Sequence, residues 1–467
     1  MISISRRWDD RENLIPALVG IWAAAIASVP EPRVKLLIAA PALFGAIAWW
    51  TLLKAERWVA LFLLAAMLLP PLPAPMGNSG VHVAPIFALL GIVTGIIRPG
   101  EWRAWRGPVP LLLLALLAVL TGSTGFAALY SGWTVALGSL ARVLLFGIGA
   151  YLFLYTLAGP RSVAWDPLRF TRVLFLAGAC GALFACIDFY YQLHSPAGHG
   201  EQFIWVGQDV FRRAQGLFYE ASTLGNFCAF FLVMVLVALF RPRGERPCSR
   251  LLLAMGGAVF AAALILSYSR ASLLTIAVAG CAFVYVRRWP IRRALVAVCL
   301  SLGSAVLFVK MALPAVSSHY WTRLELSIQY LWSSPDGVLS GRISTWKTLL
   351  YFLLQQPWHA LFGVGYKTLP YSNFTGATLI ADNTYLSLLA ETGLVGLITF
   401  LMLNIAILRT GLRCARSNQP RASFFGTWIF CFWTGEVVQM LSGDLITYWR
   451  VLPIYLWVLA TAAREAS

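Results

Sequence analysis

Long apolar runs recur along almost the whole chain, and they constrain its fold more than any other feature. A helix of about 20 apolar residues is long enough to cross the hydrocarbon core of a bilayer. Only 12% of the 467 residues are charged, against about 25% in soluble domains. The sequence therefore predicts an all-α polytopic membrane protein with about 12–14 transmembrane helices. The candidate spans are residues 14–30, 34–54, 57–72, 81–97, 109–127, 134–157, 171–190, 221–240, 251–268, 271–286, 294–313, 385–408, 423–441 and 449–463.

The basic residues, which give a net charge of +17, are concentrated in short loops between these runs. This placement follows the positive-inside rule, by which cytoplasmic loops are rich in Lys and Arg. It predicts a cytoplasmic N-terminus, and it explains the charge without a nucleic-acid partner, so we expect none. The densest groups are RPRGERPCSR (241–250), RRWPIRR (287–293) and the arginines Arg409, Arg413, Arg416 and Arg421.

Two segments on the predicted outer side, opposite the basic loops, are longer than the others. They cover residues 191–220 and 314–384. Loops longer than about 15 residues are usually functional. Within the second, SGRISTWKTLLYFLLQQ (340–356) has helical apolar spacing interrupted by polar residues. We expect it to form an amphipathic helix that lies over the bundle.

Polar residues able to carry chemistry gather in four stretches on this outer side. Three of the stretches contribute arginines, whose fixed fork of donors suits phosphate oxygens. Because an apolar helical bundle lies beside them, these arginines indicate a site for a pyrophosphate on a lipid carrier. Alternatively, each arginine could extend its charged end towards the membrane surface or pair with a carboxylate. The stretches are FRRAQGLFYEASTLGN (211–226) with Arg212, Arg213, Tyr219, Glu220 and Ser222, LSYSRAS (266–272) with Arg270, SGRISTW (340–346) with Arg342, and ADNTYLSLLAETGLVG (381–396).

The same stretches, in this order, resemble motifs of the bacterial O-antigen ligase and O-antigen (exopolysaccharide) polymerase family. The resemblance covers roughly residues 205–440. Each motif alone is weak, but the ordered set with the long outer loop is fairly specific. The motifs read RAQGLF (213–218), SR (269–270), GRISTW (341–346), FGVGY (362–366) and DNTYLSLLAETGLVG (382–396).

This resemblance implies a GT-C-type bundle in the bacterial inner membrane, with its active site facing the periplasm. It implies transfer of a glycan from undecaprenyl pyrophosphate to an acceptor hydroxyl, on a glycan or on lipid A core, without a metal or other cofactor. Residues 1–190 would then be N-terminal transmembrane helices, and residues 191–463 the catalytic region.

The family roles carry over by position. Arg213, Arg270 and Arg342 would bind the pyrophosphate, and Asp382, where the family usually has histidine, would be the base. We expect further substrate contacts from Arg212, Tyr219, Glu220 and Asn383.

Two departures from the family pattern bear on the activity. Asp382 replaces the histidine of ligases, and YEAS (219–222) looks more like the Glu-Pro-Ser of polymerases. These departures favour a surface-polysaccharide polymerase, with an O-antigen ligase as the alternative. Arg142, Glu391 and Glu436 lie inside predicted spans and keep open a different class, a transporter or flippase of lipid-linked glycans.

Four expectations about particular residues can be compared with a structure. Asp382 is either the base or the N-cap of the helix that follows, since Asp is a favoured cap. Glu391 should be buried against protein, and two of Arg142, Glu391 and Glu436 should form an ion pair. Among the outer tryptophans, Trp205 or Trp321 could stack on sugars.

Overall fold

A computed structural model describes most of the chain. The described residues are 32–71, 82–105, 107–160, 166–193, 199–206, 209–290, 314–330, 332–334, 341–372, 374–376 and 378–467, with the single positions 22, 292, 310, 311 and 336. The longer helices are α2 (Pro32–Leu53), α3 (Arg57–Leu68), α4 (Ala84–Ile97), α5 (Pro108–Ser131), α6 (Trp133–Ala158), α7 (Pro167–Tyr191), α8 (Ala221–Leu239), α9 (Arg250–Leu266), α10 (Arg270–Arg287), α12 (Pro314–Tyr330), α14 (Arg342–Gln355), α15 (Pro357–Phe362), α16 (Thr384–Ala415), α17 (Pro420–Gln439) and α18 (Leu452–Ala466). These helices, with a single two-stranded hairpin among the described residues, confirm an all-α polytopic membrane protein.

Six of the described helices are long and apolar enough to cross a membrane: α5, α6, α7, α8, α10 and α16. Helices α3, α4 and α9 are apolar but have 17 residues or fewer, which is short for a bilayer core about 30 Å thick. The predicted first span, 14–30, and most of the eleventh, 294–313, lie outside the described residues.

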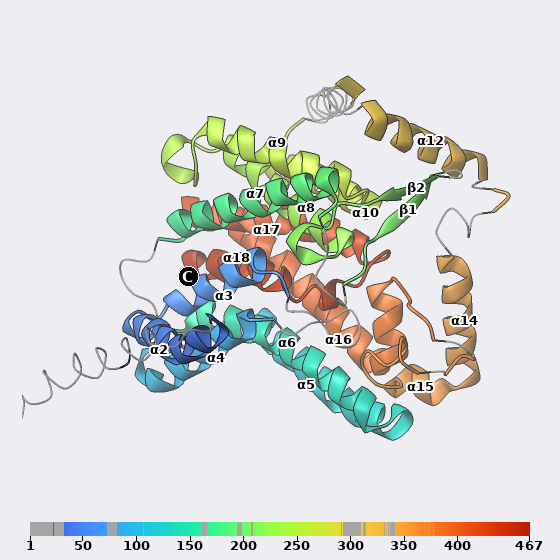
Figure 1. Cartoon of the computed structure of the whole chain (residues 1–467), viewed down its shortest axis with the longest axis horizontal. Coiled ribbons are helices and arrows are strands. Elements are labelled where there is room, and N and C mark those ends of the chain that lie inside the picture. The colour runs from blue at the N-terminus through green and yellow to red at the C-terminus, as the bar shows by residue number, and fades with distance from the viewer. Residues whose placement is uncertain are drawn as a thin grey trace, which may run out of the picture.

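Helix α8 is the centre of the bundle. In its most apolar window 78% of the residues are buried, compared with 28% in the corresponding windows of α5 and α10. Helices α9, α10 and α17 pack against it (Figure 1). Helix α18 packs on α17 and also reaches α8, where the rings of Tyr455 and Phe230 lie 4.4 Å apart. A helix that is apolar on all sides and surrounded by other helices in this way belongs to the core, whereas its neighbours keep one face for lipid.

The two ends of this bundle differ in their charged residues. At one end, where α8, α10 and α16 finish and α9 and α17 begin, lie the predicted cytoplasmic basic loops; we call it the basic end. Arg241 there pairs with Glu245 at 3.5 Å, and Arg421 pairs with Asp166 at 3.5 Å.

At the opposite end the two long segments contain more structure than the sequence predicted. The first holds a two-stranded antiparallel hairpin, β1 (Phe203–Val206) and β2 (Asp209–Arg212). The second holds α12, α14 and α15, of which only α14 was predicted. The sequence of α12 mixes polar and apolar residues without a clear stripe, and α15 has only six residues. Figure 1 shows α14 and α15 beside the end of α16, with α12 beside the hairpin.

Helix α16 is broken near this end, although the sequence predicted one continuous span. Gly393 has φ +70° and ψ −173°, which are not helical values. The segment 362–366 crosses the break: the amides of Val364 and Gly365 donate to the carbonyl oxygens of Ala390 and Glu391 at 3.1 and 2.9 Å. These bonds satisfy carbonyl groups that the interrupted helix leaves without partners.

Candidate active site

A cavity of about 870 Å³ opens at the end of the bundle opposite the basic loops. Its walls come from β1, α12, the starts of α8, α10 and α14, and the end of α17, so distant parts of the sequence meet here. The lining residues are Phe203, Ile204, Trp205, Arg213, Ser222, Tyr268, Ser269, Arg270, Ala271, Arg323, Leu326, Ser327, Tyr330, Ser334, Arg342, Gln439, Ser442 and Tyr448. Four of them are arginines, contributed by four separate stretches of the chain.

Arg213 is held in place by the backbone on both of its sides. Its amide donates to the carbonyl of Gln202 at 2.9 Å, which extends the hairpin by one residue. Its Nε donates to the carbonyl of Ser267 at 2.8 Å, at the end of α9. Burial lowers the pKa of the guanidinium, and the nearby charge of Arg270 lowers it further. The side chain is therefore fixed with one edge bound to protein and the remaining donors available to the cavity.

Arg270 is the first residue of α10 and follows a tight turn. Tyr268 in this turn has φ +53°, and the hydroxyls of Ser269 and Ser272 are hydrogen-bonded at 2.8 Å. Helix α8 approaches the turn so closely that a Cβ on Gly225 would lie 2.7 Å from the Cβ of Ser269. Glycine at position 225 thus lets the turn pack on the central helix, and this contact fixes where Arg270 enters the cavity.

The GRISTW motif positions Arg342. Gly341 has φ +79°, a conformation that favours glycine, and Arg342 begins α14 directly after it. The indole of Trp346 donates to the carbonyl of Ala381 at 2.8 Å, which ties α14 to the start of α16. Arg342 Nη2 then lies 3.4 Å from Asp382 Oδ2. Two motifs that are forty residues apart are joined by this ion pair.

Arg323 is a fourth cavity arginine that the sequence did not single out. It lies on α12, and its Nη1 is buried with no hydrogen-bond partner in the part of the chain that the structure describes. Burial lowers its pKa to about 10, and the charges of Arg270 and Arg213 add to the shift. No local pattern marks this arginine, because α12 lacks a helical stripe and the neighbours of Arg323 are distant in sequence.

Several positive groups held together at one site raise one another's electrostatic energy. Burial is the main cause of the lowered pKa of Arg323, and the like charges of Arg270 and Arg213 lower it further because they also disfavour the charged form. An anion bound between the guanidinium groups would remove this cost and satisfy the unpartnered N–H groups. The cavity is therefore suited to a ligand that carries several negative charges.

The structure excludes the cap role that the sequence left open for Asp382. The cap of α16 is the next residue, Asn383, whose Oδ1 accepts from the amides of Tyr385 and Leu386 at 3.0 and 3.1 Å. Asp382 has φ +46°, whereas Asn383 has the extended backbone, φ −155°, that an N-cap adopts. The Asp382 side chain is 51% exposed and does not cap the helix. Asn383 is buried, and its side-chain oxygen is used by the helix.

Glu220 is a partly buried carboxyl group, and burial can tune a carboxyl group for general base catalysis by raising its pKa. It precedes α8, and its Oε2 accepts from the Thr223 hydroxyl at 2.7 Å. Burial raises the pKa of this carboxyl, whereas Thr223 and then Arg213 lower it. The charges of Asp444 and then Asp382 also raise it, but neither Glu220 nor Asp382 is among the residues that line the cavity.

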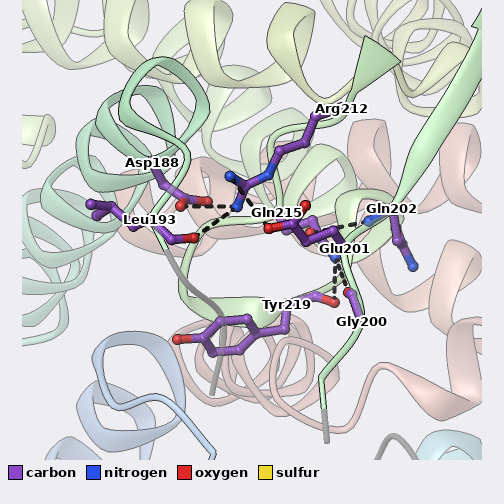
Figure 2. A network of polar contacts seen from close by, with 8 residues as sticks. All are labelled: Asp188, Leu193, Gly200, Glu201, Gln202, Arg212, Gln215 and Tyr219. Atoms are coloured by element: carbon purple, nitrogen blue, oxygen red, sulfur yellow. Dashed lines mark hydrogen bonds and ion pairs between the residues drawn. The ribbon is translucent and has the colours of Figure 1, made fainter. Parts of the chain in front are cut away.

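Arg212 does not line the cavity, although Arg213 beside it does. Its guanidinium lies 3.3 Å from Asp188 at the end of α7 and 3.7 Å from Glu201 (Figure 2). Gln215 continues this network, donating to the carbonyl groups of Gly200 and Tyr219 at 3.1 and 2.9 Å. The network anchors the hairpin to α7, and Tyr219 takes part through its backbone. Arg212 and Tyr219 thus support the position of Arg213.

The ionisable groups inside the bundle have separate partners, which corrects the predicted ion pair. Arg142 donates to the hydroxyl of Tyr371 at 2.6 Å. Glu436 accepts from Asn226 at 2.5 Å. Glu391 is 1% exposed, as expected for a carboxyl at this depth, and accepts from the backbone of the segment that crosses the α16 break. In the described residues no two of Arg142, Glu391 and Glu436 form an ion pair.

A second polar cluster lies next to this break. Lys367, which directly follows the crossing segment 362–366, forms a salt bridge with Asp444. Burial would lower the pKa of Lys367, but the carboxylates of Asp444 and Glu391 together raise it. One oxygen of Glu391 has no hydrogen-bond partner among the described residues. This cluster explains how a lysine and a glutamate can both be buried here.

Comparison with known proteins agrees with the motifs. Residues 255–401, from α9 into α16, match the family model described as O-antigen ligase. The matched stretch includes Arg270, Arg323, Arg342 and Asp382 and begins after Arg213. No curated protein matches the chain. The match confirms the predicted resemblance, over fewer residues than the motifs suggested: residues 255–401 are similar to the O-antigen ligase domain.

Proposed function

We propose that this protein is a surface-polysaccharide polymerase that transfers a glycan from undecaprenyl pyrophosphate to the hydroxyl of an acceptor glycan. At the level of the family, it is a membrane glycosyltransferase of surface-polysaccharide synthesis. The donor, the acceptor and the polymerase activity are parts of the proposal, as is a reaction on the periplasmic face of the inner membrane. The positive-inside rule supports this face, because the cavity and the basic loops lie at opposite ends of the bundle.

The proposal rests mainly on the four arginines that share one cavity, Arg213, Arg270, Arg323 and Arg342. Pyrophosphate carries several negative charges, and guanidinium forks match its oxygens. The cavity is also larger than this group requires, since pockets of about 300–1,000 Å³ hold whole drug-sized ligands. A sugar attached to the pyrophosphate would fit beside the arginines.

In the proposed reaction, the acceptor oxygen attacks the anomeric carbon of the donor sugar. A new glycosidic C–O bond forms while the bond from that carbon to the pyrophosphate oxygen breaks. The arginines stabilise the negative charge that develops on the departing lipid pyrophosphate. Pyrophosphate is already a good leaving group, so the protein has mainly to neutralise charge and align the two substrates.

A carboxylate is proposed to take the proton of the acceptor hydroxyl. Asp382 is the first candidate because it occupies the family's histidine position and pairs with a cavity arginine. Glu220 is the second, because burial raises its pKa and thereby makes it a stronger base. Since the two residues interact, the variants described in the Discussion are designed to separate them.

A ligase is the alternative activity, and the name of the matched family favours it. A ligase would attach finished polymer to lipid A core. Deletion of the gene, followed by analysis of surface glycans, distinguishes the two. A polymerase mutant should lose long chains and keep single repeat units on the acceptor. Undecorated acceptor together with accumulated carrier-linked polymer would support a ligase and overturn the polymerase proposal.

A further inference from the structure

Three large aromatic side chains in the wall of the cavity remain exposed. Trp205 is 71% exposed, Phe203 50% and Tyr330 47%, yet all three line the same cavity as the arginines. Phe203 and Trp205 are two residues apart on β1 and so project from the same face of the strand. Tyr330 ends α12, which lies against β1.

The surroundings of these rings are polar as well as apolar. Ser327 and Ser334 line the cavity with them, and Arg323 lies one turn before Ser327 on α12. Exposed aromatic faces beside hydroxyl groups suit a ligand with both C–H surfaces and hydroxyl groups. The Ser327 hydroxyl donates to the carbonyl of Arg323 at 2.7 Å, and its oxygen can still accept a hydrogen bond from a ligand hydroxyl.

The aromatic part of the wall is formed by elements other than the candidate membrane-spanning helices. Neither β1 nor α12 belongs to the described helices that are long and apolar enough to cross a membrane. Both come from the two long segments at the cavity end of the bundle. An occupant between them would thus be in contact with the arginines on one side and with solvent on the other.

From these observations we infer that Phe203, Trp205 and Tyr330 form a saccharide subsite in which sugar rings stack on the aromatic side chains. The inference rests on the proposed function, because it assigns the sugar next to the pyrophosphate a place in the same cavity. The sugar can belong to the donor or to the acceptor, and the experiments distinguish these two sources.

The first test measures saccharide binding without transfer. The probe is the repeat-unit oligosaccharide released by mild acid from the surface polysaccharide of the producing cell, and the protein is the full chain in lipid nanodiscs. Trp205→Ala and Tyr330→Ala should each raise the dissociation constant about tenfold, the loss typical of truncating one anchor residue. Trp321→Ala is the matched control, since Trp321 is on α12 and 55% exposed but does not line the cavity.

Unchanged binding in both cavity variants, or equal weakening by Trp321→Ala, would overturn the inference. Thermal unfolding of each variant checks that the fold is retained, and Trp205→Phe, which keeps an aromatic ring, should recover most of the binding. Because no transfer is needed, this result can be interpreted even if the proposed reaction is wrong. Conversely, Arg323→Lys should impair transfer and leave oligosaccharide binding intact.

The second test identifies the source of the sugar by steady-state kinetics. A KM that rises about tenfold for the acceptor alone assigns the subsite to the acceptor, and one that rises for the donor alone assigns it to the donor glycan. If Trp205→Ala changes only the preference between donors with long and short prenyl chains, the wall holds the lipid tail and the saccharide inference fails.

Discussion

The two ends of the bundle use arginine in different ways. At the basic end, Arg241 and Arg421 pair with carboxylates, and Arg287 donates to the carbonyl of Phe240 at 3.1 Å. At the cavity end, four arginines face one another, and the paired carboxylate of Arg342, Asp382, is itself half exposed. The number of arginines in a region is thus a weak guide to function. What matters is whether their charge is already neutralised by the protein.

The sharpest contrast between the two ends should be their accessibility from outside the cell. Cysteine introduced at Ser334, in a background without reactive native cysteines, should react with an impermeant maleimide in intact cells. Cysteine introduced at Asn418, which is exposed at the basic end, should react only after the membrane is opened. Labelling of Asn418→Cys alone in intact cells would reverse the orientation and remove the basis for a periplasmic reaction.

Loss of the base should produce the largest change in rate. General base catalysis typically contributes 10²–10⁴-fold, so the correct carboxylate variant, Asp382→Asn or Glu220→Gln, should lower kcat by about that factor. Asp382→His, which restores the usual family residue, should remain active if Asp382 is the base.

The pH profile separates the two carboxylates further. If Glu220 is the base, it must be ionised, and because burial raises its pKa, activity should fall with decreasing pH above the ordinary range of a glutamate. This acidic limb should vanish in Glu220→Gln. Full activity in both Asp382→Asn and Glu220→Gln would exclude both candidates.

Substitution of the cavity arginines should have the next largest effect. Arg213→Lys and Arg323→Lys keep the charge but lose the fork of donors, and we expect kcat to fall on the order of 10²-fold, as when a charge-stabilising donor is removed. Arg243→Lys is the control, because Arg243 is exposed at the basic end. If the three variants have equal rates in a reconstituted transfer assay, the distinction between the two ends does not extend to catalysis.

Replacing the glycine at the break in α16 with alanine should lower stability far more than the same replacement in a regular helix. A Cβ on Gly393 would lie 2.1 Å from the carbonyl oxygen of Leu361, and φ is +70°. Gly393→Ala should lower the free energy of unfolding by several kcal/mol, of which about 1–2 kcal/mol is the backbone term. Gly280→Ala in α10 meets no atom within 4 Å and should be neutral or slightly stabilising. Thermal unfolding in detergent compares the two, and equal stability would mean that the break is not required.

The smallest effects should come from two helix caps. Asn383 caps α16 at the cavity end, and Ser249 caps α9 at the basic end through its side chain at 3.3 Å from the Leu252 amide. Replacing either with alanine should lower stability by about 1 kcal/mol. Only Asn383→Ala should also reduce activity, because it loosens the backbone that carries Asp382. An equal loss of activity in Ser249→Ala would show that the effect is general destabilisation.

Long apolar runs and ordered motifs were sufficient to predict the helical membrane fold and the convergence of Arg213, Arg270 and Arg342. They were insufficient for Arg323, because the significance of this residue comes from neighbours more than fifty residues away. They also left a cap role open for Asp382, since Asp and Asn are equally good caps by residue type. Only the backbone, left-handed at Asp382 and extended at Asn383, decides between them.

The position of the break in α16 also indicates how deep residues 384–392 lie in the membrane. Residues 394–415 form a rod about 33 Å long at 1.5 Å per residue, close to the ~30 Å of a hydrocarbon core. Residues 384–392 would then stand above the acyl chains, at the level of the lipid headgroups. The length of this rod is thus matched to membrane thickness, and lipids with longer acyl chains should partly submerge residues 384–392.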